Sequence, residues 1–275
     1  MTKKPLLLFK YGGNAMTDDD IKIKVLQNIT ELKKSGYDVV IVHGGGPFIR
    51  QELERAGIQS EFIAGHRVTT EQAYYYVAMA LKGIVNFDLV SIMNRLGNRA
   101  VGISGIDGKL VTASKRKHQS IVNGNVVDVD LGRVGDVDSI NPELIHVLLQ
   151  SNYIPVVACL AADEEGNGYN INGDMFAGHL AGALRAEQFI VLTDVDGILL
   201  DKENKDSIIH ELNLSELDDL YNKKVIQGGM IPKADACKLA LRKGAQSVRI
   251  INGTKPAQIP SIANSQSTGT LIRNK

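Results

Sequence analysis

The stretch Leu7-Leu8-Phe9-Lys10-Tyr11-Gly12-Gly13-Asn14 decides how the rest of the chain is interpreted. An apolar run suited to a buried strand ends in a lysine and two glycines, and Asp18 then opens an amphipathic helix pattern. Glycines between a strand and a helix let backbone N–H groups approach an anion, and the helix N-terminus adds partial positive charge. The stretch therefore predicts an anion site, with phosphate as the expected anion.

A second strand pattern, residues 38 to 42, runs directly into His43-Gly44-Gly45-Gly46-Pro47. Because a helix pattern separates the two strands, we expect a right-handed β-α-β unit and an α/β fold. Three successive glycines cost backbone entropy that a plain turn does not require, which favours a ligand-binding loop. For Lys10 with Gly12 and Gly13 alone, a turn beside a surface lysine remains the simpler interpretation. A histidine at a strand end, such as His43, is more typical of a structural residue than of a base.

Composition excludes several classes of function. The chain has 275 residues, 44% of them hydrophobic and 23% charged, with 31 basic and 31 acidic side chains, so no net charge steers it to nucleic acid or an anionic membrane. Cys159 and Cys237 lack the spacing of a metal or redox motif and are predicted to be reduced core residues. Lys10 interrupts the first apolar run too early for a signal peptide or membrane span, which predicts a cytoplasmic protein.

The remaining chain alternates strand and helix patterns without an internal repeat or flexible linker. Residues 71 to 98 give a long apolar helix pattern with a possible break near Gly83, and its several apolar faces predict burial in the core or in a homodimer contact. Residues 109 to 138 contain Asn123-Gly124 between β-forming residues, which predicts an antiparallel hairpin at the edge of the sheet. Any two lobes are expected to share one continuous sheet, with a change of role near Asp174.

Three further groups of polar residues are candidates for a binding site. Arg67, in a loop before a helix, has the fork geometry that clamps a carboxylate, although a lone loop arginine is usually solvated. Asn170, Asn172 and Asp174 alternate and would share one face of an extended segment, with an Asn/Asp-rich turn as the alternative. Lys233 follows a glycine pair near a helix start, and taken alone it is more simply interpreted as an exposed lysine on a capped helix.

The usual nucleotide motifs, G-x-x-x-x-G-K-[ST] and G-x-G-x-x-G, are absent from the sequence. Taken together, however, five segments in this order resemble the acetylglutamate kinase branch of the amino-acid kinase family. They are Lys10-Tyr11-Gly12-Gly13, His43-Gly44-Gly45-Gly46-Pro47, Gly65-His66-Arg67-Val68-Thr69, Asn170-Ile171-Asn172-Gly173-Asp174 and Gly228-Gly229-Met230-Ile231-Pro232-Lys233. Each segment is weak alone, but the set covers nearly the whole chain.

The resemblance implies an open three-layer α/β/α sandwich with a mainly parallel central sheet. Residues 1–174 would form an N-terminal lobe for acetylglutamate binding and dimerisation, and residues 175–275 a C-terminal lobe for ATP binding. It further implies that the γ-phosphoryl group of MgATP passes to the side-chain carboxylate of N-acetyl-L-glutamate, a step of arginine biosynthesis. Members inhibited by arginine carry an extra N-terminal helix, whereas here the first strand pattern begins almost at once, so a homodimer without arginine feedback is expected.

The resemblance also assigns roles to individual residues. Lys10 and Lys233 match the two lysines that stabilise the transition state, and Asp174 matches the aspartate that positions them. The implied substrate-binding residues are Gly45, Gly46, Arg67, Asn170 and Asn172. The implied nucleotide-binding residues are Gly13, Gly44, Thr193, Asp194, Gly228, Gly229 and Met230. No protein metal site is implied, since Mg²⁺ would be carried by the nucleotide phosphates.

This set of residues suits the implied chemistry. A glutamate-type carboxylate has a pKa of about 4.3 and is already a nucleophilic anion at neutral pH, so no general base is required. Two anions must instead be aligned and the charge on the transferring group neutralised, which lysines, Mg²⁺ and glycine N–H groups can do. The alternatives are another kinase of the family, acting on LysW-linked aminoadipate, aspartate or glutamate, and a catalytically silent ligand-binding sensor with the same fold.

Overall fold

The structure is a computed structural model that describes residues 4–122, 125–201, 203–264 and 268–274. Its centre is an eight-stranded sheet with the strand order β14-β16-β15-β13-β1-β2-β10-β5. Neighbouring strands are parallel except for the pair β15 and β16. The strands are β1 Leu6–Tyr11, β2 Asp38–His43, β5 Ala100–Ser104, β10 Ile154–Ala158, β13 Gln188–Thr193, β14 Glu211–Asn213, β15 Ser247–Asn252 and β16 Thr270–Arg273. One continuous sheet therefore runs through both predicted lobes.

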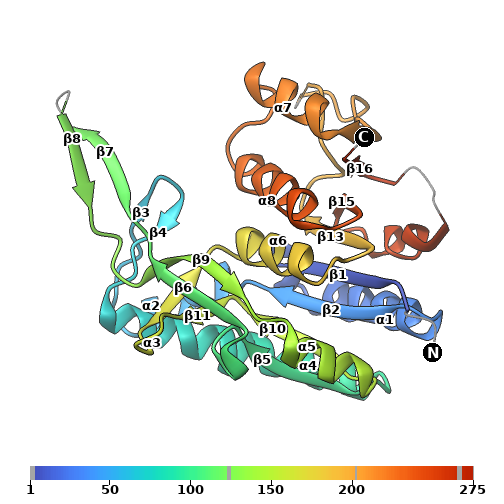
Figure 1. The fold of residues 1–275 in the computed structure, drawn as a ribbon, viewed down its shortest axis with the longest axis horizontal. Coiled ribbons are helices and arrows are strands. Elements are labelled where there is room, and N and C mark those ends of the chain that lie inside the picture. The colour runs from blue at the N-terminus through green and yellow to red at the C-terminus, as the bar shows by residue number, and fades with distance from the viewer. Residues whose placement is uncertain (1–3, 123–124, 202, 265–267, 275) are drawn as a thin grey trace.

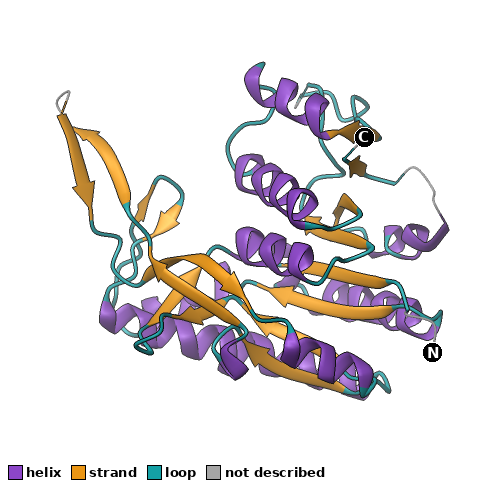
Figure 2. Ribbon diagram, in the orientation of Figure 1, coloured by secondary structure: helices purple, strands orange, loops and turns teal. Residues whose placement is uncertain are grey.

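Helices cover both faces of this sheet, as Figure 2 shows. They are α1 Asp19–Lys34, α2 Gly46–Arg55, α3 Glu71–Ala78, α4 Phe87–Arg95, α5 Glu143–Gln150, α6 Gly173–Ala183, α7 Leu214–Asn222 and α8 Met230–Lys243, with short 3₁₀ turns η1 Gly13–Met16, η3 Asp107–Lys109, η4 Pro256–Gln258 and η5 Pro260–Asn264. The expected three-layer α/β/α sandwich is confirmed.

The alternation of side chains along β1 explains how its apolar run serves two cores. Leu6 and Leu8 pack with side chains of α2, α3, α6 and α8, whereas Leu7 and Phe9 pack with side chains of α1 and α4 on the opposite face. A strand with both faces covered reads as a continuous apolar run because successive side chains point to opposite faces. By the same period, Lys10 projects to the face that α6 and α8 cover.

The long apolar helix pattern does not break at Gly83. Residues 71 to 95 form one helix in which α3 and α4 are joined by the π-helical segment η2, Met79–Asn86. By length and composition this helix is one that can cross a membrane, but 44% of its most apolar window is buried in the molecule. Leu81, Val85 and Leu89 are fully or almost fully buried in the two cores, as expected of a core helix. The predicted break near Gly83 is therefore wrong. The helix continues through Gly83 as a π-helical segment.

The apolar run after residue 154 divides between two sheets. After β10, strand β11 Leu160–Ala162 joins β6 Val111–Lys115, β9 Val134–Ile140 and β12 Gly168–Ile171 in a small closed barrel. Two further hairpins are β3 Phe62–Ile63 with β4 His66–Arg67, and β7 His118–Val122 with β8 Asn125–Val129.

The hairpin predicted around Asn123-Gly124 forms, although these two residues lie outside the described ones. Its predicted place at the edge of the main sheet is wrong, because β7 and β8 pair only with one another and project away from the body in Figure 1. Alternation of apolar and polar residues indicates a strand that pairs with another. It does not indicate which sheet the two strands join.

Candidate functional site

The structure brings three charged groups from distant parts of the chain into contact. The Lys10 Nζ lies 2.9 Å from Asp174 Oδ1, and the Lys233 Nζ lies 3.4 Å from Asp174 Oδ2. All three side chains are at most 18% exposed. The two ammonium groups therefore stand on either side of one carboxylate at the carboxyl end of β1, where side chains that act on one ligand converge.

Helix starts hold two of these groups in place. Asp174 lies in the first turn of α6, and Asn172 is the N-cap residue whose Oδ1 accepts from the N–H groups of Asp174 and Met175. Lys233 lies in the first turns of α8 and also donates to the Gly229 carbonyl at 3.3 Å. Helices α6 and α8 pack side by side (Figure 1), so their two N-termini add partial positive charge near one place.

The predicted extended face of Asn170, Asn172 and Asp174 is wrong. Asn170 belongs to β12, but the chain turns at Asn172 and enters α6 at Gly173. The Asn172 oxygen is taken by the helix cap, because a short polar side chain before a helix is better satisfied by the free N–H groups of the first turn. The alternation of Asn170, Asn172 and Asp174 in the sequence therefore spans the end of a strand and the start of a helix, and it does not mark one face of a strand.

Asp174 is held as a carboxylate. Burial alone would raise its pKa, but Lys10 and Lys233 outweigh burial and lower the pKa below the usual range. A lowered pKa in the folded state means that the ionised group contributes stability above the unfolded value of about 3.9, and that this contribution is lost as the pH falls through the folded value. The two lysines thus keep a fixed negative partner throughout the neutral range.

Glycines leave open space directly beside Lys10. A Cβ built on Gly12 would lie 3.3 Å from the Lys10 Nζ and 3.7 Å from the Gly44 nitrogen. A Cβ on Gly173 would lie 3.8 Å from both the Lys10 Cε and the Gly44 Cα. Gly13 has φ +73°, a backbone conformation that favours glycine. The glycine turns after β1 and β2 and the start of α6 therefore meet close to Lys10, where the absence of side chains lets the backbone approach its ammonium group.

Arg67 lies beside the second glycine turn, and Asn170 contacts Thr69, two residues further along the chain. The Arg67 guanidinium donates to Ser60 Oγ and to the Gly46 carbonyl, the latter at 3.3 Å, and lies 4.6 Å from the centre of the Phe62 ring. The Asn170 Nδ2 donates to Thr69 Oγ1 at 3.4 Å. Burial lowers the pKa of Arg67, and the nearby Arg50 acts in the same direction. The predicted carboxylate clamp is therefore oriented by Ser60 and Gly46.

A cavity of about 400 Å³ adjoins Lys233 in the C-terminal part. Its lining includes the predicted nucleotide-binding residues Thr193, Asp194, Gly229 and Met230, together with seven residues that the sequence patterns did not single out: Val195, Gly197, Ile198, Leu199, Val225, Ile226 and Gln227. Gly228 is not among the lining residues. Most of the missed residues are aliphatic or glycine, which carry no motif signal before the loops come together. An apolar cavity with a lysine at its mouth suits a flat base and a phosphate chain.

His43 is a structural residue, as expected. It is fully buried, its Nδ1 lies 3.0 Å from the Gly44 oxygen, and its Nε2 lies 2.9 Å from the Asn86 Nδ2. Burial lowers the pKa of His43 to about 4, the Gly44 contact opposes the shift, and Lys82 adds to it. A neutral, enclosed imidazole does not reach a substrate.

The two cysteines, Cys159 and Cys237, are free and buried, as predicted.

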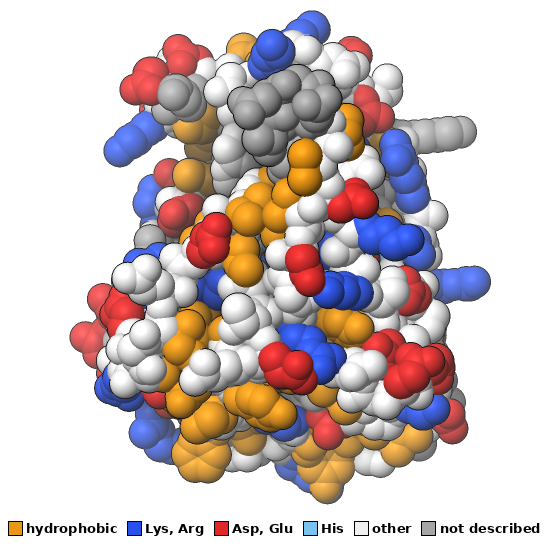
Figure 3. All heavy atoms as spheres, turned by 90° about the vertical axis from the view of Figure 1, so that its left-hand side faces the viewer, with side chains coloured by type: hydrophobic (Ala, Val, Ile, Leu, Met, Phe, Trp, Pro, Cys, Tyr) orange, Lys and Arg blue, Asp and Glu red, His pale blue; other side chains and the backbone are white. Residues whose placement is uncertain are grey.

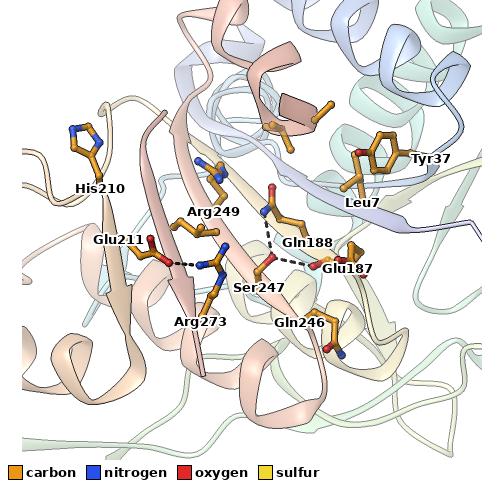
Figure 4. Close-up of a pocket in the computed structure, with 13 residues that line it drawn as sticks. Leu7, Tyr37, Glu187, Gln188, His210, Glu211, Gln246, Ser247, Arg249 and Arg273 are labelled. Carbon is orange, nitrogen blue, oxygen red and sulfur yellow. Dashed lines mark hydrogen bonds and ion pairs between the residues drawn. The ribbon is translucent and has the colours of Figure 1, made fainter. Parts of the chain in front are cut away.

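A second cavity, of about 530 Å³, lies at the opposite end of the strands (Figure 4). Two of its charged side chains have partners within the protein: Arg273 pairs with Glu211, and the Arg249 Nη1 donates to the Thr268 carbonyl at 2.7 Å. Figure 3 looks instead onto the edge where the carboxyl ends of β1 and β2 lie, and basic and acidic side chains alternate near the middle of that face. The candidate site belongs to this second edge.

The contact of Lys10 and Lys233 with one aspartate, the glycine turns at two strand ends and an adjoining apolar cavity form an arrangement that suits phosphoryl transfer. The family model described as the amino acid kinase family matches residues 5–252 of this chain, and the chain belongs to that family. An acetylglutamate kinase of Methanococcus aeolicus is 43% identical over 97% of this chain and 91% of its own length. An acetylglutamate kinase of Desulfitobacterium hafniense is 43% identical over 92% of this chain and 85% of its own length.

Solved structures agree on the fold. The protein smu.665 of Streptococcus mutans superimposes with a TM-score of 0.77 at 27% identity, covering 98% of this chain and 99% of its own. The carbamate kinase of Giardia lamblia bound to AMP-PNP gives a TM-score of 0.70 at 18% identity, covering 99% of both chains.

Proposed function

We propose that this protein is an acetylglutamate kinase, which transfers the γ-phosphoryl group of ATP to the side-chain carboxylate of N-acetyl-L-glutamate and releases ADP. The observation that carries the proposal is the contact of Lys10 and Lys233 with Asp174 between the glycine turns. The similarity to acetylglutamate kinases over nearly the whole chain supports the choice of acceptor acid.

The reaction needs alignment and charge neutralisation more than proton transfer. The acceptor carboxylate attacks the γ-phosphorus, the bond to the bridging oxygen of ATP breaks, and negative charge spreads over the transferring oxygens. Lys10 and Lys233 donate to those oxygens from opposite sides, and Asp174 keeps both ammonium groups aimed at the same place. Gly13 presents its N–H group close by, whereas the predicted Gly44 N–H is already taken by the Tyr11 carbonyl. Arg67 holds the α-carboxylate of the acceptor.

ATP enters with Mg²⁺, which supplies charge neutralisation on the phosphates when bound. Phosphate oxygens are ligands that Mg²⁺ takes in kinase sites, and we propose them as its ligands here. Among the described residues no three His, Cys, Asp or Glu side chains are grouped to hold a metal ion. Thr193, Asp194, Gly229 and Met230 line the cavity in which we place the nucleotide. A supply of ATP and two reduced cysteines fit a cytoplasmic enzyme.

The substrate is tested by measuring ADP release with saturating MgATP and one acid at a time. We expect turnover with N-acetylglutamate and at least about 100-fold lower kcat/KM with glutamate, because a site built for an amide leaves polar groups unpaired around a free ammonium. Aspartate and aminoadipate serve as further acceptors. Turnover restricted to one of these acids would make the protein another kinase of the family, and no turnover with any acid would favour a silent ligand-binding sensor.

We also propose a homodimer formed through the outer face of the helix spanning residues 71 to 95. Tyr75, Met79 and Phe87 are 64%, 59% and 70% exposed on it, and Ile84 is 37% exposed. Figure 3 shows hydrophobic side chains along the lower margin of that view, on the side of the molecule where α3 and α4 lie in Figure 1. An apolar strip of this kind on a soluble protein is typical of an interface.

A charged residue in this strip is expected to separate the subunits. Phe87→Glu should convert a dimer to a monomer in sedimentation equilibrium, because each subunit would bury an unpaired carboxylate in the interface. Val147→Glu, at a residue that is 53% exposed on α5, is the matched control and should leave the dimer intact. An unchanged mass for Phe87→Glu, or a monomeric starting protein, would contradict this arrangement.

A further inference from the structure

We infer that Asn86 and His43 are positioning residues that fix the orientation of the peptide between Gly44 and Gly45, and through it the N–H group that faces the acceptor acid. The role assigned to that N–H rests on the proposed function. The hydrogen-bond chain itself does not, because it is defined by contacts among buried groups.

The direction of the chain follows from one unambiguous acceptor. The Asn86 Nδ2 lies 2.9 Å from the Val156 carbonyl oxygen, which can only accept, so this atom must be the amide nitrogen. The same nitrogen lies 2.9 Å from the His43 Nε2, which must therefore accept. The proton of the neutral imidazole is then on Nδ1, and Nδ1–H donates to the Gly44 carbonyl at 3.0 Å.

These contacts hold Gly44 from both sides. Its N–H donates to the Tyr11 carbonyl at 3.1 Å, and its C=O accepts from His43. Because a trans peptide is planar, fixing the Gly44 C=O also fixes the Gly45 N–H, which points in the opposite direction. Two bonds thus determine where a backbone donor of the glycine turn is aimed, although glycine itself imposes little restriction.

The π-helical segment η2 lets one helix reach both the glycine turn and His43. A Cβ built on Gly45 would lie 2.9 Å from Leu81 Cδ2 and 3.2 Å from Val85 Cγ2, so these side chains press against the turn from behind. Leu81 and Asn86 are five residues apart, which would place them about 140° apart around an α-helix. In a π-helix, where hydrogen bonds join residues five apart, they come to the same side. The π segment therefore orients Asn86 towards His43.

Gly102 on β5 provides the space that Asn86 occupies. A Cβ at Gly102 would lie 2.0 Å from Asn86 Oδ1. Gly102→Ala must therefore displace the Asn86 amide without altering any residue of the glycine turn or His43. It gives a second, independent way to break the same chain of contacts.

The direct test is the ¹⁵N spectrum of the imidazoles in the full-length protein, assigned with a His43→Gln variant. In the wild type we expect His43 to be neutral at pH 7 with Nδ1 protonated. In Asn86→Asp the new carboxylate can only accept, so Nε2 should become protonated. A wild-type signal with Nε2 protonated and Nδ1 bare overturns the inference, whether or not the protein is active.

The kinetic test uses whichever acid the protein phosphorylates. For Asn86→Ala and Gly102→Ala we expect kcat/KM for the acid to fall about 10- to 100-fold, because a small misplacement of an aligned donor is costly, with KM for ATP changed less than about threefold. Asn94→Ala is the matched control, since Asn94 on α4 bridges to the backbone of Ala100 in β5 and does not contact the turn. Equal kinetic losses in Asn86→Ala and Asn94→Ala, or equal losses for acid and ATP, would reduce Asn86 to a purely structural role and overturn the inference.

Discussion

Replacing Lys10 with alanine is expected to lower kcat by roughly 10²- to 10³-fold, the effect of removing one preorganised donor to a developing negative charge. The ammonium group is fixed 2.9 Å from Asp174 before any substrate arrives, so no reorganisation is needed as the phosphoryl group transfers. The interaction between Lys10 and the transferring phosphoryl oxygens strengthens in the transition state. The KM values for ATP and the acid should therefore change much less than kcat. Initial-rate kinetics under saturating MgATP measure both.

Lys22→Ala is the control for loss of a buried lysine. Lys22 is 6% exposed, against 8% for Lys10, and pairs with Asp19 at 2.8 Å and Asp88 at 2.6 Å. This variant should lower the free energy of unfolding while kcat stays within about twofold of the wild type. The Asp19 contact lies within α1 and the Asp88 contact joins α1 to α4, so neither involves the glycine turns. A Lys10→Ala enzyme with near wild-type kcat would remove Lys10 from the mechanism.

The second large effect is expected for Asp174→Asn. The substitution keeps the shape of the side chain but leaves the Lys10 and Lys233 ammonium groups without their shared carboxylate, so we expect kcat to fall at least about 100-fold. Removing one partner of a buried ion pair costs roughly 3–5 kcal/mol of stability. Thermal unfolding should therefore show a clearly lower Tm for the free variant.

MgATP should distinguish this electrostatic cause from a general loss of packing. Phosphate oxygens bring negative charge to the same lysines, so the difference in Tm between the variant and the wild type should shrink when MgATP is saturating. Asp88→Asn, which removes one of the two carboxylates that pair with Lys22, should show a Tm difference that MgATP leaves unchanged. A constant difference for Asp174→Asn would argue against a shared anion site at the two lysines.

The sequence was most informative where each element has a local cause. The strands β1 and β2, helix α1 with its Asp18 cap and helix α7 were predictable because apolar period, caps and glycines act over a few residues. The sheet that the hairpin β7–β8 joins was not predictable, since pairing partners depend on long-range packing. The continuity of the helix through Gly83 was also missed, because a π turn leaves no mark in local propensity.

The candidate site divides in the same way. Lys10, Asp174 and Lys233 were each unconvincing alone, and only their order in the chain suggested a common site. The contacts of Asn86 carry no motif at all, because an asparagine within an apolar helix acquires a function only when His43 and Val156 fold against it. The sequence signal is the presence of a polar residue within an apolar helix pattern. Such a residue becomes buried and then needs a specific hydrogen-bond partner.

The position of β1 in the sheet has a consequence for how the protein is made. Strand β1 is synthesised before both of its neighbours: β2 follows closely, but β13 begins only at residue 188. Until then one edge of the central strand has unpaired N–H and C=O groups, which are a template for pairing with other nascent chains. Protection of that edge therefore comes late in synthesis, after Asp174 has already emerged to meet Lys10.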